Sequence, residues 1–164
     1  GLGDVYKRQA LWLARVFLDI LKDLGAGQGL GLWIGLSTFS GLITNFMSDA
    51  ATTALIGPIA IPMGLMTGVS GEPWASGMAV AWATSFAHFL IVGTPNNAIV
   101  YGLGIYPDSG EKMIHPFDFV KYGFVLWIIS LVICWVIGFM VMYNVIGFPP
   151  HITETAISVL QSTP

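Results

Sequence analysis

The segment ITNFMSDAATTALIGPIAIP, residues 43–62, carries one carboxylate, Asp49, among side chains that are nearly all apolar, small or hydroxylic. An ionisable side chain at membrane depth costs at least about 2.5 kcal/mol on insertion scales, so its presence marks a candidate functional site. Asp49 is also a suitable N-cap for a helix that begins near residue 51. The two roles are compatible, because a capping carboxylate that faces a cavity can also contact a cation.

A second polar motif, GTPNNA at residues 93–98, interrupts an apolar run. Pro95 has no backbone donor and disfavours helix at the residue before it, which leaves carbonyl groups of the preceding turn without intrahelical partners. These carbonyls are candidate ion ligands. Asn97 is either a helix cap or a ligand, while Thr44 and Thr94 flank the two interruptions.

Other chemistries find little support. Ser48 and Asp49 are adjacent and cannot readily flank His88 in a hydrolase triad, so His88 is interpreted as a proton relay or as a side chain satisfied by a carbonyl. The GLGD motif that ends at Asp4 resembles the signature of intramembrane aspartyl proteases, but no second helix carries a Tyr-Asp pair. One cysteine, Cys134, provides neither a disulfide framework nor a zinc site. We therefore predict a protein that is not an enzyme and has no cofactor.

The composition indicates an all-α membrane protein. The 164 residues are 55% hydrophobic and only 9% charged, with a mean hydropathy of +0.76, whereas a soluble domain has roughly 25% charged residues. Six Lys and Arg residues and a net charge of −3 leave no basic face for nucleic acid. The expected surroundings are the lipid bilayer.

Two uncharged runs, residues 30–47 and 50–69, are separated only by Ser48 and Asp49. Each run is long enough for a membrane helix, but two residues are too few to form an aqueous loop between two complete spans. The pattern predicts a re-entrant hairpin whose tip turns inside the membrane. Such a tip must be surrounded by protein or by a water-filled cavity, because lipid offers its backbone no hydrogen-bond partners.

A further uncharged stretch, residues 74–92, predicts a membrane helix that continues to the GTPNNA motif and resumes beyond it. A charged loop and a long apolar helix follow. The first nine residues resemble translated adapter sequence and are expected to lie outside the fold. The predicted organisation has three regions, namely an artefact at 1–9, a membrane transport domain at 10–146 and a polar tail at 147–164. Within the transport domain we expect an amphipathic helix at 10–24, the hairpin at about 29–68, the broken helix at about 74–104 and the last transmembrane helix at about 118–146.

A hairpin tip and a broken helix within one short membrane domain are typical of secondary transporters. In these proteins the ends of half-helices meet near the membrane midplane, where helix N-termini favour the anionic substrate and unwound carbonyls hold the cation. The two interruptions therefore favour a transport function.

Three segments in order, TNFMSDAATTALIGPIA, SFAHFLIVGTPNNAIVYGLG and PFDFVKYGFVLWIISLVICWVI, resemble the C-terminal half of the divalent anion:sodium symporters, which carry dicarboxylates, citrate and sulfate. The resemblance covers about residues 25–148. It implies the second of two inverted repeats, a missing N-terminal repeat, a homodimer when the protein has its full length, and a multi-pass position in a bacterial inner membrane. It also implies transport of a small divalent anion coupled to sodium.

The resemblance implies the following site residues. Sodium would be held by Thr44, Ser48, Asp49 and Gly93, and the substrate would lie beside Ser48, Asp49, Ala50, Thr94, Pro95 and Asn97.

This sequence departs from the family at the tip. The family motif Ser-Asn-Thr reads Ser48-Asp49-Ala50, so a carboxylate replaces an amide and a methyl replaces a hydroxyl. A carboxylate favours a hard cation but repels an anionic substrate nearby. Three interpretations stay open at this point: sodium neutralises Asp49, a proton takes the place of sodium as the coupling ion, or the substrate is not a dicarboxylate.

Overall fold

The computed structural model describes residues 12 and 15–147, and this part of the chain is helical with no β-strand. The all-α prediction is therefore confirmed for the described residues. The predictions for residues 1–9 and 148–164 lie outside them. After a helical stretch at residues 15–23, the elements are α2 (Gly29–Ile43), α3 (Asp49–Met66), α4 (Glu72–Ala83), α5 (Pro95–Leu103), α6 (Pro116–Ile133) and the π-helical segment η1 (Cys134–Ile146).

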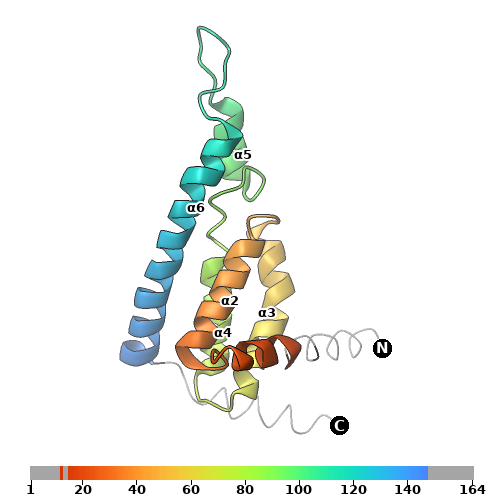
Figure 1. Cartoon of the computed structure of the whole chain (residues 1–164), viewed down its shortest axis with the longest axis vertical. Helices are drawn as coiled ribbons and strands as arrows, with labels where there is room; N and C mark the ends of the chain where they lie inside the picture. The colour runs from red at the N-terminus through yellow and green to blue at the C-terminus, as the bar shows by residue number, and fades with distance from the viewer. Residues whose placement is uncertain (1–11, 13–14, 148–164) are drawn as a thin grey trace.

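The helices α2 and α3 run antiparallel and are joined by the short turn 44–48, and α4 packs against both of them (Figure 1). The helices α6 and η1 follow one another as a single 31-residue helical stretch along the side of this group. The helix α5 lies beyond the hairpin turn, beside the first turns of α6 (Figure 1). The sequence did not indicate the wider π-helical geometry after Cys134.

Local capping explains where the hairpin turns. The helix α2 ends at Ile43, and the N–H groups of Asn45 and Phe46 bond back to Leu42 O and Ile43 O in a tightened last turn. Ser48 has extended backbone geometry, and its hydroxyl accepts a hydrogen bond from the N–H of Ala51 at 3.2 Å. Ser48 is therefore the N-cap of α3, and Asp49 is its first helical residue. The capping role that the sequence also offered for Asp49 thus belongs to Ser48, because the shorter serine side chain already satisfies the free donor.

The broken helix is interrupted earlier than the sequence predicts. The helix α4 ends at Ala83 rather than continuing to residue 92, and backbone of irregular geometry occupies residues 84–94 before α5 begins at Pro95. The reason lies in contacts with the hairpin: Asn45 accepts a hydrogen bond from the N–H of Phe89, so this donor does not form an intrahelical bond. His88 consequently lies in the irregular segment and not on a helix.

Glycine residues allow several elements to approach closely. A methyl group at Gly64 of α3 would lie 2.6 Å from the carbonyl oxygen of Glu72, and one at Gly123 of α6 would lie 2.3 Å from that of His88. Small residues at such contacts are typical of helices that associate in membranes, where apolar burial gives little driving force.

Glu72 joins the first turns of α2 and α4 at the base of the hairpin. Its side chain is 1% exposed, and its carboxylate accepts a hydrogen bond from the N–H of Gly29. Desolvation by burial raises the pKa of Glu72 above its ordinary value, and the bond from Gly29 opposes part of that rise. Glu72 is the first residue of α4 and precedes the uncharged stretch 74–92.

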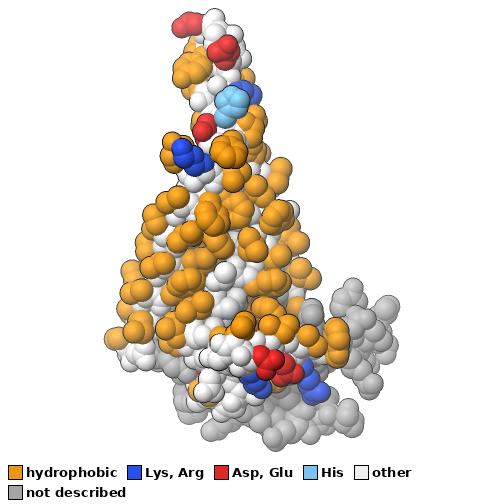
Figure 2. Space-filling model, viewed as in Figure 1, with side chains coloured by type: hydrophobic (Ala, Val, Ile, Leu, Met, Phe, Trp, Pro, Cys, Tyr) orange, Lys and Arg blue, Asp and Glu red, His pale blue; other side chains and the backbone are white. Residues whose placement is uncertain are grey.

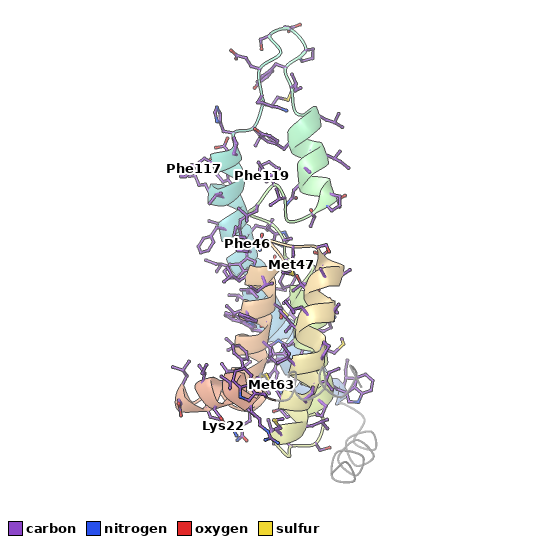
Figure 3. The ribbon with its side chains drawn as sticks, turned by 90° about the vertical axis from the view of Figure 1, so that its right-hand side faces the viewer. Lys22, Phe46, Met47, Met63, Phe117 and Phe119 are labelled. Atoms are coloured by element: carbon purple, nitrogen blue, oxygen red, sulfur yellow. The ribbon has the colours of Figure 1, made fainter. Side chains whose placement is uncertain are left out.

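Charged side chains gather at the two ends of the molecule and leave an apolar band between them (Figure 2). Lys22 lies at one end and Phe117 and Phe119, in the first turn of α6, lie toward the other, whereas Phe46 and Met47 at the hairpin turn lie between these ends (Figure 3). Among the described residues, α3 and the α6–η1 stretch are long and apolar enough to cross a membrane.

Candidate functional site

The hairpin turn contacts the irregular segment 84–94 directly. The hydroxyl oxygen of Thr44 lies 2.6 Å from the carbonyl oxygen of Thr84 and 3.0 Å from Oδ1 of Asp49. Thr44 is fully buried, while Asp49 is partly exposed. The hydroxyl has one proton and therefore donates to only one of these two acceptors at a time. The group is thus rich in oxygen acceptors, which suits a bound cation.

Threonine side chains extend this oxygen-rich group. The hydroxyl of Thr53 donates to the carbonyl of Asp49 at 2.9 Å and lies 3.3 Å from the hydroxyl of Thr84. The hydroxyl of Thr84 in turn lies 2.9 Å from the carbonyl of Ala81. Thr53 therefore bonds its own helix backbone, as threonines in helices commonly do, and also reaches the end of α4.

The residues on either side of Asp49 face outward. Ser48 and Ala50 are exposed, and the Ser48 hydroxyl already caps α3. The structure therefore brings Thr44 and Asp49 into contact with each other, and it places Ser48 and Ala50 at the open side of the same turn.

At the second interruption, Thr94 and not Asn97 caps the following helix. The hydroxyl of Thr94 accepts a hydrogen bond from the N–H of Asn97 at 3.3 Å, and Pro95 occupies the first helical position, where a missing N–H has no cost. The side-chain amide of Asn97 instead donates to the carbonyls of Ala87 and Leu90 at 2.8 and 2.9 Å. Of the two roles left open for Asn97, that of helix cap is therefore excluded, because Thr94 is the cap and the Asn97 amide bonds carbonyls of the irregular segment.

Gly93 is buried against the hairpin turn. A methyl group at this position would lie 3.1 Å from the carbonyl oxygen of Asn45 and 3.1 Å from the side chain of Ala87. Glycine therefore allows the irregular segment to pack against the backbone of the turn.

Four helix ends lie around this contact. The helices α2 and α4 end here, with Thr44 and Thr84 as their C-caps, and α3 and α5 begin here, with Ser48 and Thr94 as their N-caps. Helix C-termini carry partial negative charge and favour cations, whereas N-termini carry partial positive charge and favour anions. The arrangement therefore suits a cation and an anion held near one another.

A cation at this place would have hard ligands. Within the part of the chain that the structure describes, no three His, Cys, Asp or Glu side chains lie close enough together to hold a metal ion. The available donors are hydroxyl and carbonyl oxygens with the single carboxylate of Asp49, a set that fits an alkali cation better than a transition metal.

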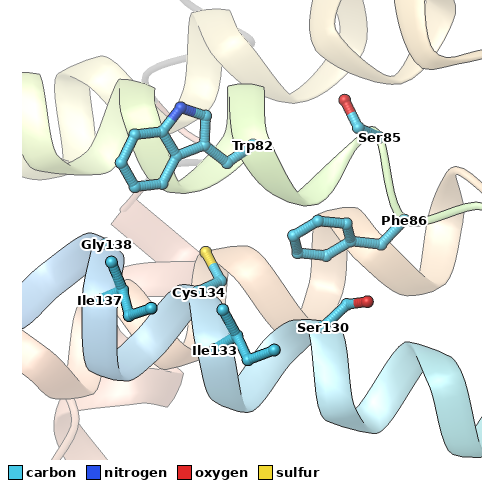
Figure 4. A pocket seen from close by; sticks show the side chains of 8 residues that line it. All are labelled: Trp82, Ser85, Phe86, Ser130, Ile133, Cys134, Ile137 and Gly138. Atoms are coloured by element: carbon cyan, nitrogen blue, oxygen red, sulfur yellow. The ribbon is translucent and has the colours of Figure 1, made fainter.

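Two open grooves lie beside the site. One, of about 400 Å³, runs between the end of α4 and the α6–η1 stretch, with Trp82 and Phe86 facing Cys134 and Ser130 (Figure 4). The other, of about 580 Å³, lies between α5 and α6 and includes His88 and Asn97 in its lining. Nε2 of His88 lies 3.2 Å from the hydroxyl of Ser130. The sequence left open whether His88 is a proton relay or is satisfied by a carbonyl, and its partner here is a hydroxyl.

Sequence reasoning missed Asn45 and Thr84. Both are buried in the contact between the hairpin turn and the irregular segment. A signal for Asn45 was present, since a side-chain amide in an apolar run is costly unless it is hydrogen-bonded. Thr84 gave no comparable signal, because a threonine in a helix can bond its own backbone.

The chain is similar to three proteins that are named as transporters. The chain is 38% identical over 115 residues to YfbS of Escherichia coli, named an uncharacterized transporter, which is 70% of this chain and 17% of that protein. It is 31% identical over 129 residues to an uncharacterized transporter of Haemophilus influenzae, which is 77% of this chain and 26% of that protein. It is 33% identical over 119 residues to the uncharacterized transporter MJ0672 of Methanocaldococcus jannaschii, which is 71% of this chain and 24% of that protein.

The chain thus spans about a quarter or less of the length of the curated relatives that it matches. No family model and no solved structure matches it significantly. All three of these relatives are named as transporters, and the described part of the chain contains helices that are long and apolar enough to cross a membrane.

Proposed function

We propose that this chain is the C-terminal repeat of a secondary active transporter that moves a small divalent anion together with sodium. The observation that carries the proposal is the contact between two non-helical segments, the hairpin turn 44–48 and the segment 84–94, inside a body of apolar helices. Irregular backbone at membrane depth is expected where it lines a site for ions or substrate. The names of the relatives support transport, and the sequence resemblance supports the anion and the sodium ion.

In the proposed site the C-terminal ends of α2 and α4 face the cation, with Thr44, Ser48, Asp49 and the backbone of Gly93 as its ligands. The carboxylate of Asp49 supplies the charge, and the hydroxyl of Thr44 lies beside it. A bound sodium ion would also compensate the charge that a carboxylate carries into an apolar region.

The anion is proposed to lie at the N-terminal ends of α3 and α5, beside Ser48, Asp49, Ala50, Thr94, Pro95 and Asn97. Since the amide donors of Asn97 already bond Ala87 and Leu90, contact with the anion falls mainly to the free backbone donors of these first turns. In this proposal sodium neutralises Asp49 before the anion binds.

Proton coupling is the alternative, and one observation favours it. The Thr44 hydroxyl lies within hydrogen-bond distance of both the Asp49 carboxylate and the Thr84 carbonyl, but it has only one proton to donate. A protonated Asp49 would supply the second proton. A proton would also remove the repulsion between Asp49 and an anion.

The proposed surroundings are a bacterial inner membrane that the protein crosses several times, the N-terminal repeat of the same transporter, and a second copy of the full-length protein. The many apolar side chains exposed along α6 and η1 fit contact with lipid or with these partners. The names of the relatives favour a transporter over an enzyme.

Uptake of labelled succinate, citrate and sulfate into vesicles that contain the full-length protein tests the proposal. Sodium in the outer buffer is compared with potassium, and an imposed pH gradient is compared with none. Accumulation of one anion that depends on sodium supports the proposal, and accumulation that follows the pH gradient alone supports the alternative. Folded protein that accumulates none of the three anions under any condition would contradict both.

A further inference from the structure

Two asparagine side chains satisfy the backbone of the irregular segment 84–94. Asn97, from α5, donates to the carbonyls of Ala87 and Leu90. Asn45, from the hairpin turn, accepts from the N–H of Phe89 at 3.0 Å. Backbone groups in an apolar region must find partners inside the protein, so these two amides supply bonds that a continuous helix would have made internally.

Asn45 differs from Asn97 because it comes from the opposite side of the contact. Its amide nitrogen lies 2.7 Å from the carbonyl oxygen of Gly41 in α2 and 3.4 Å from that of Phe86. The side chain is fully buried, and the backbone of Gly93 packs against its own backbone. Asn45 therefore contacts the segment 84–94 near its start, its middle and its end.

A third element joins at the same point. The indole N–H of Trp127 in α6 donates to the carbonyl of Gly41 at 2.9 Å, and this carbonyl also accepts from Asn45. The backbone of His88 and Phe89 packs directly on Gly123, one turn before Trp127. The turn, the irregular segment and α6 are thus held by one continuous set of buried contacts.

We infer that Asn45 is a positioning residue of the transport site, which fixes the segment 84–94 against the hairpin turn so that the ligands on both sides keep one geometry. The inference rests on the proposed function. Asn45 is next to Thr44 in the chain, and it spans from Gly41 to Phe89. Without Asn45, the cation ligands on the turn would shift relative to those on the segment. Binding would then weaken, since a small misplacement of a binding group has a large effect on binding.

Amide hydrogen exchange of the full-length protein tests the structural part. Asn45→Ala removes every side-chain bond, Asn45→Asp keeps the acceptor for Phe89 and removes the donors, and Asn144→Ala changes an exposed asparagine of η1 as the matched control. Asn45→Ala is expected to speed exchange in residues 84–94 about tenfold, as for the loss of one or two hydrogen bonds, with little change in α2, α3 and α4. Faster exchange in all elements, or no change at 84–94, would overturn the inference.

Sodium-dependent uptake by the same variants tests the functional part. Asn45→Asp and Asn45→Ala are expected to raise the sodium concentration for half-maximal uptake and the KM for the anion about tenfold, with a smaller effect on the maximal rate. Asn144→Ala is expected to match the wild type. If Asn45→Ala does not fold, the half-saturation values of Asn45→Asp decide the question. Unchanged values in a folded variant would mean that Asn45 has a structural role only.

The two experiments separate failure of the inference from failure of the proposed function. A wild-type protein that shows no sodium-dependent uptake would contradict the proposed function, and the positioning of its ligands would fall with it. A wild-type protein that transports with sodium while its Asn45 variants keep their half-saturation values would contradict the inference alone.

Discussion

At the scale of single residues, the candidate site is a place where hydrogen-bond acceptors outnumber the protons available to them. Thr44 offers one proton to two acceptors, the carbonyl of Thr84 and the carboxylate of Asp49. In water such a mismatch has little consequence, because solvent supplies further donors. In an apolar region it leaves an acceptor that a cation or a proton can occupy, since an unsatisfied buried acceptor costs about 1 to 3 kcal/mol.

The first prediction concerns Asp49→Asn in the full-length protein. The amide is nearly the same size as the carboxylate but has no charge, so sodium should bind more weakly. The half-saturation concentration for sodium in uptake assays is expected to rise about tenfold, the effect of one bond to a charged group. Asp108→Asn, in the exposed loop, is the control. Sodium and pH profiles that both match the wild type would leave Asp49 with a structural role only.

The second prediction concerns Glu72. Because burial raises its pKa, the folded protein binds a proton on Glu72 more readily than the unfolded chain does. Stability is therefore highest below the ordinary pKa of 4.5 and falls as the pH rises from there through the raised pKa of the folded state. Glu72→Gln removes the ionisation and should flatten this fall.

Thermal unfolding of the full-length protein between pH 4 and pH 8 measures this effect. Glu111→Gln, in an exposed loop, is the matched control and is expected to keep the wild-type profile. A Glu72→Gln protein whose unfolding midpoint falls with pH as steeply as that of the wild type would show that another group controls the pH dependence.

At the scale of elements, sequence patterns located the interruptions better than they located the ends of the helices. The uncharged runs and the candidate cap Asp49 predicted where α3 begins to within about two residues, because a cap is a local signal, although the cap itself is Ser48. The end of α4 at Ala83 was not predictable, since the residues that follow it bond to Thr44 and Asn45, some forty residues earlier. Periodicity carries no information about a partner on another element.

The same limit applies to the candidate site. Thr44 and Asp49 were found from their chemistry, because a polar residue in an apolar run is informative on its own. Thr84 and the contact between Gly123 and His88 were not found, because neither residue type departs from what a membrane helix tolerates.

The third prediction tests that contact. In Gly123→Ala, the added methyl group would lie 2.3 Å from the carbonyl of His88, a backbone atom that cannot move without shifting the irregular segment. Stability is expected to fall by about 1 to 3 kcal/mol, as for other overpacked sites. Gly102→Ala in α5 is the control, because a methyl there meets nothing within 4 Å and alanine favours helix. Thermal unfolding that ranks the two variants equally would contradict the predicted clash.

At the scale of the whole molecule, the hairpin explains how irregular backbone can lie between two charged ends. The helices α2 and α3 have 15 and 18 residues, or roughly 22 and 27 Å at 1.5 Å per residue, and the α6–η1 stretch has 31 residues. The hairpin is therefore shorter than the stretch beside it, and α5 lies beyond its turn (Figure 1). The segment 84–94 lies beside the hairpin turn, and the two interruptions are therefore in contact.

The last prediction follows from this geometry. If the hairpin is re-entrant, a spin label at Phe46, an exposed side chain in the turn, should lie deeper in the bilayer than labels at Ser70 and Ser109, which belong to turns at opposite ends of the molecule. Depth is measured by comparing collisions with oxygen, which concentrates in lipid, and with a water-soluble nickel complex, in full-length protein whose Cys134 is replaced by alanine. Two complete spans would instead place the Phe46 label at the same depth as the Ser109 label. A deep Phe46 label, with Ser70 and Ser109 both shallow, would place the contact between Thr44 and Thr84 inside the membrane, where a transported ion has to be held.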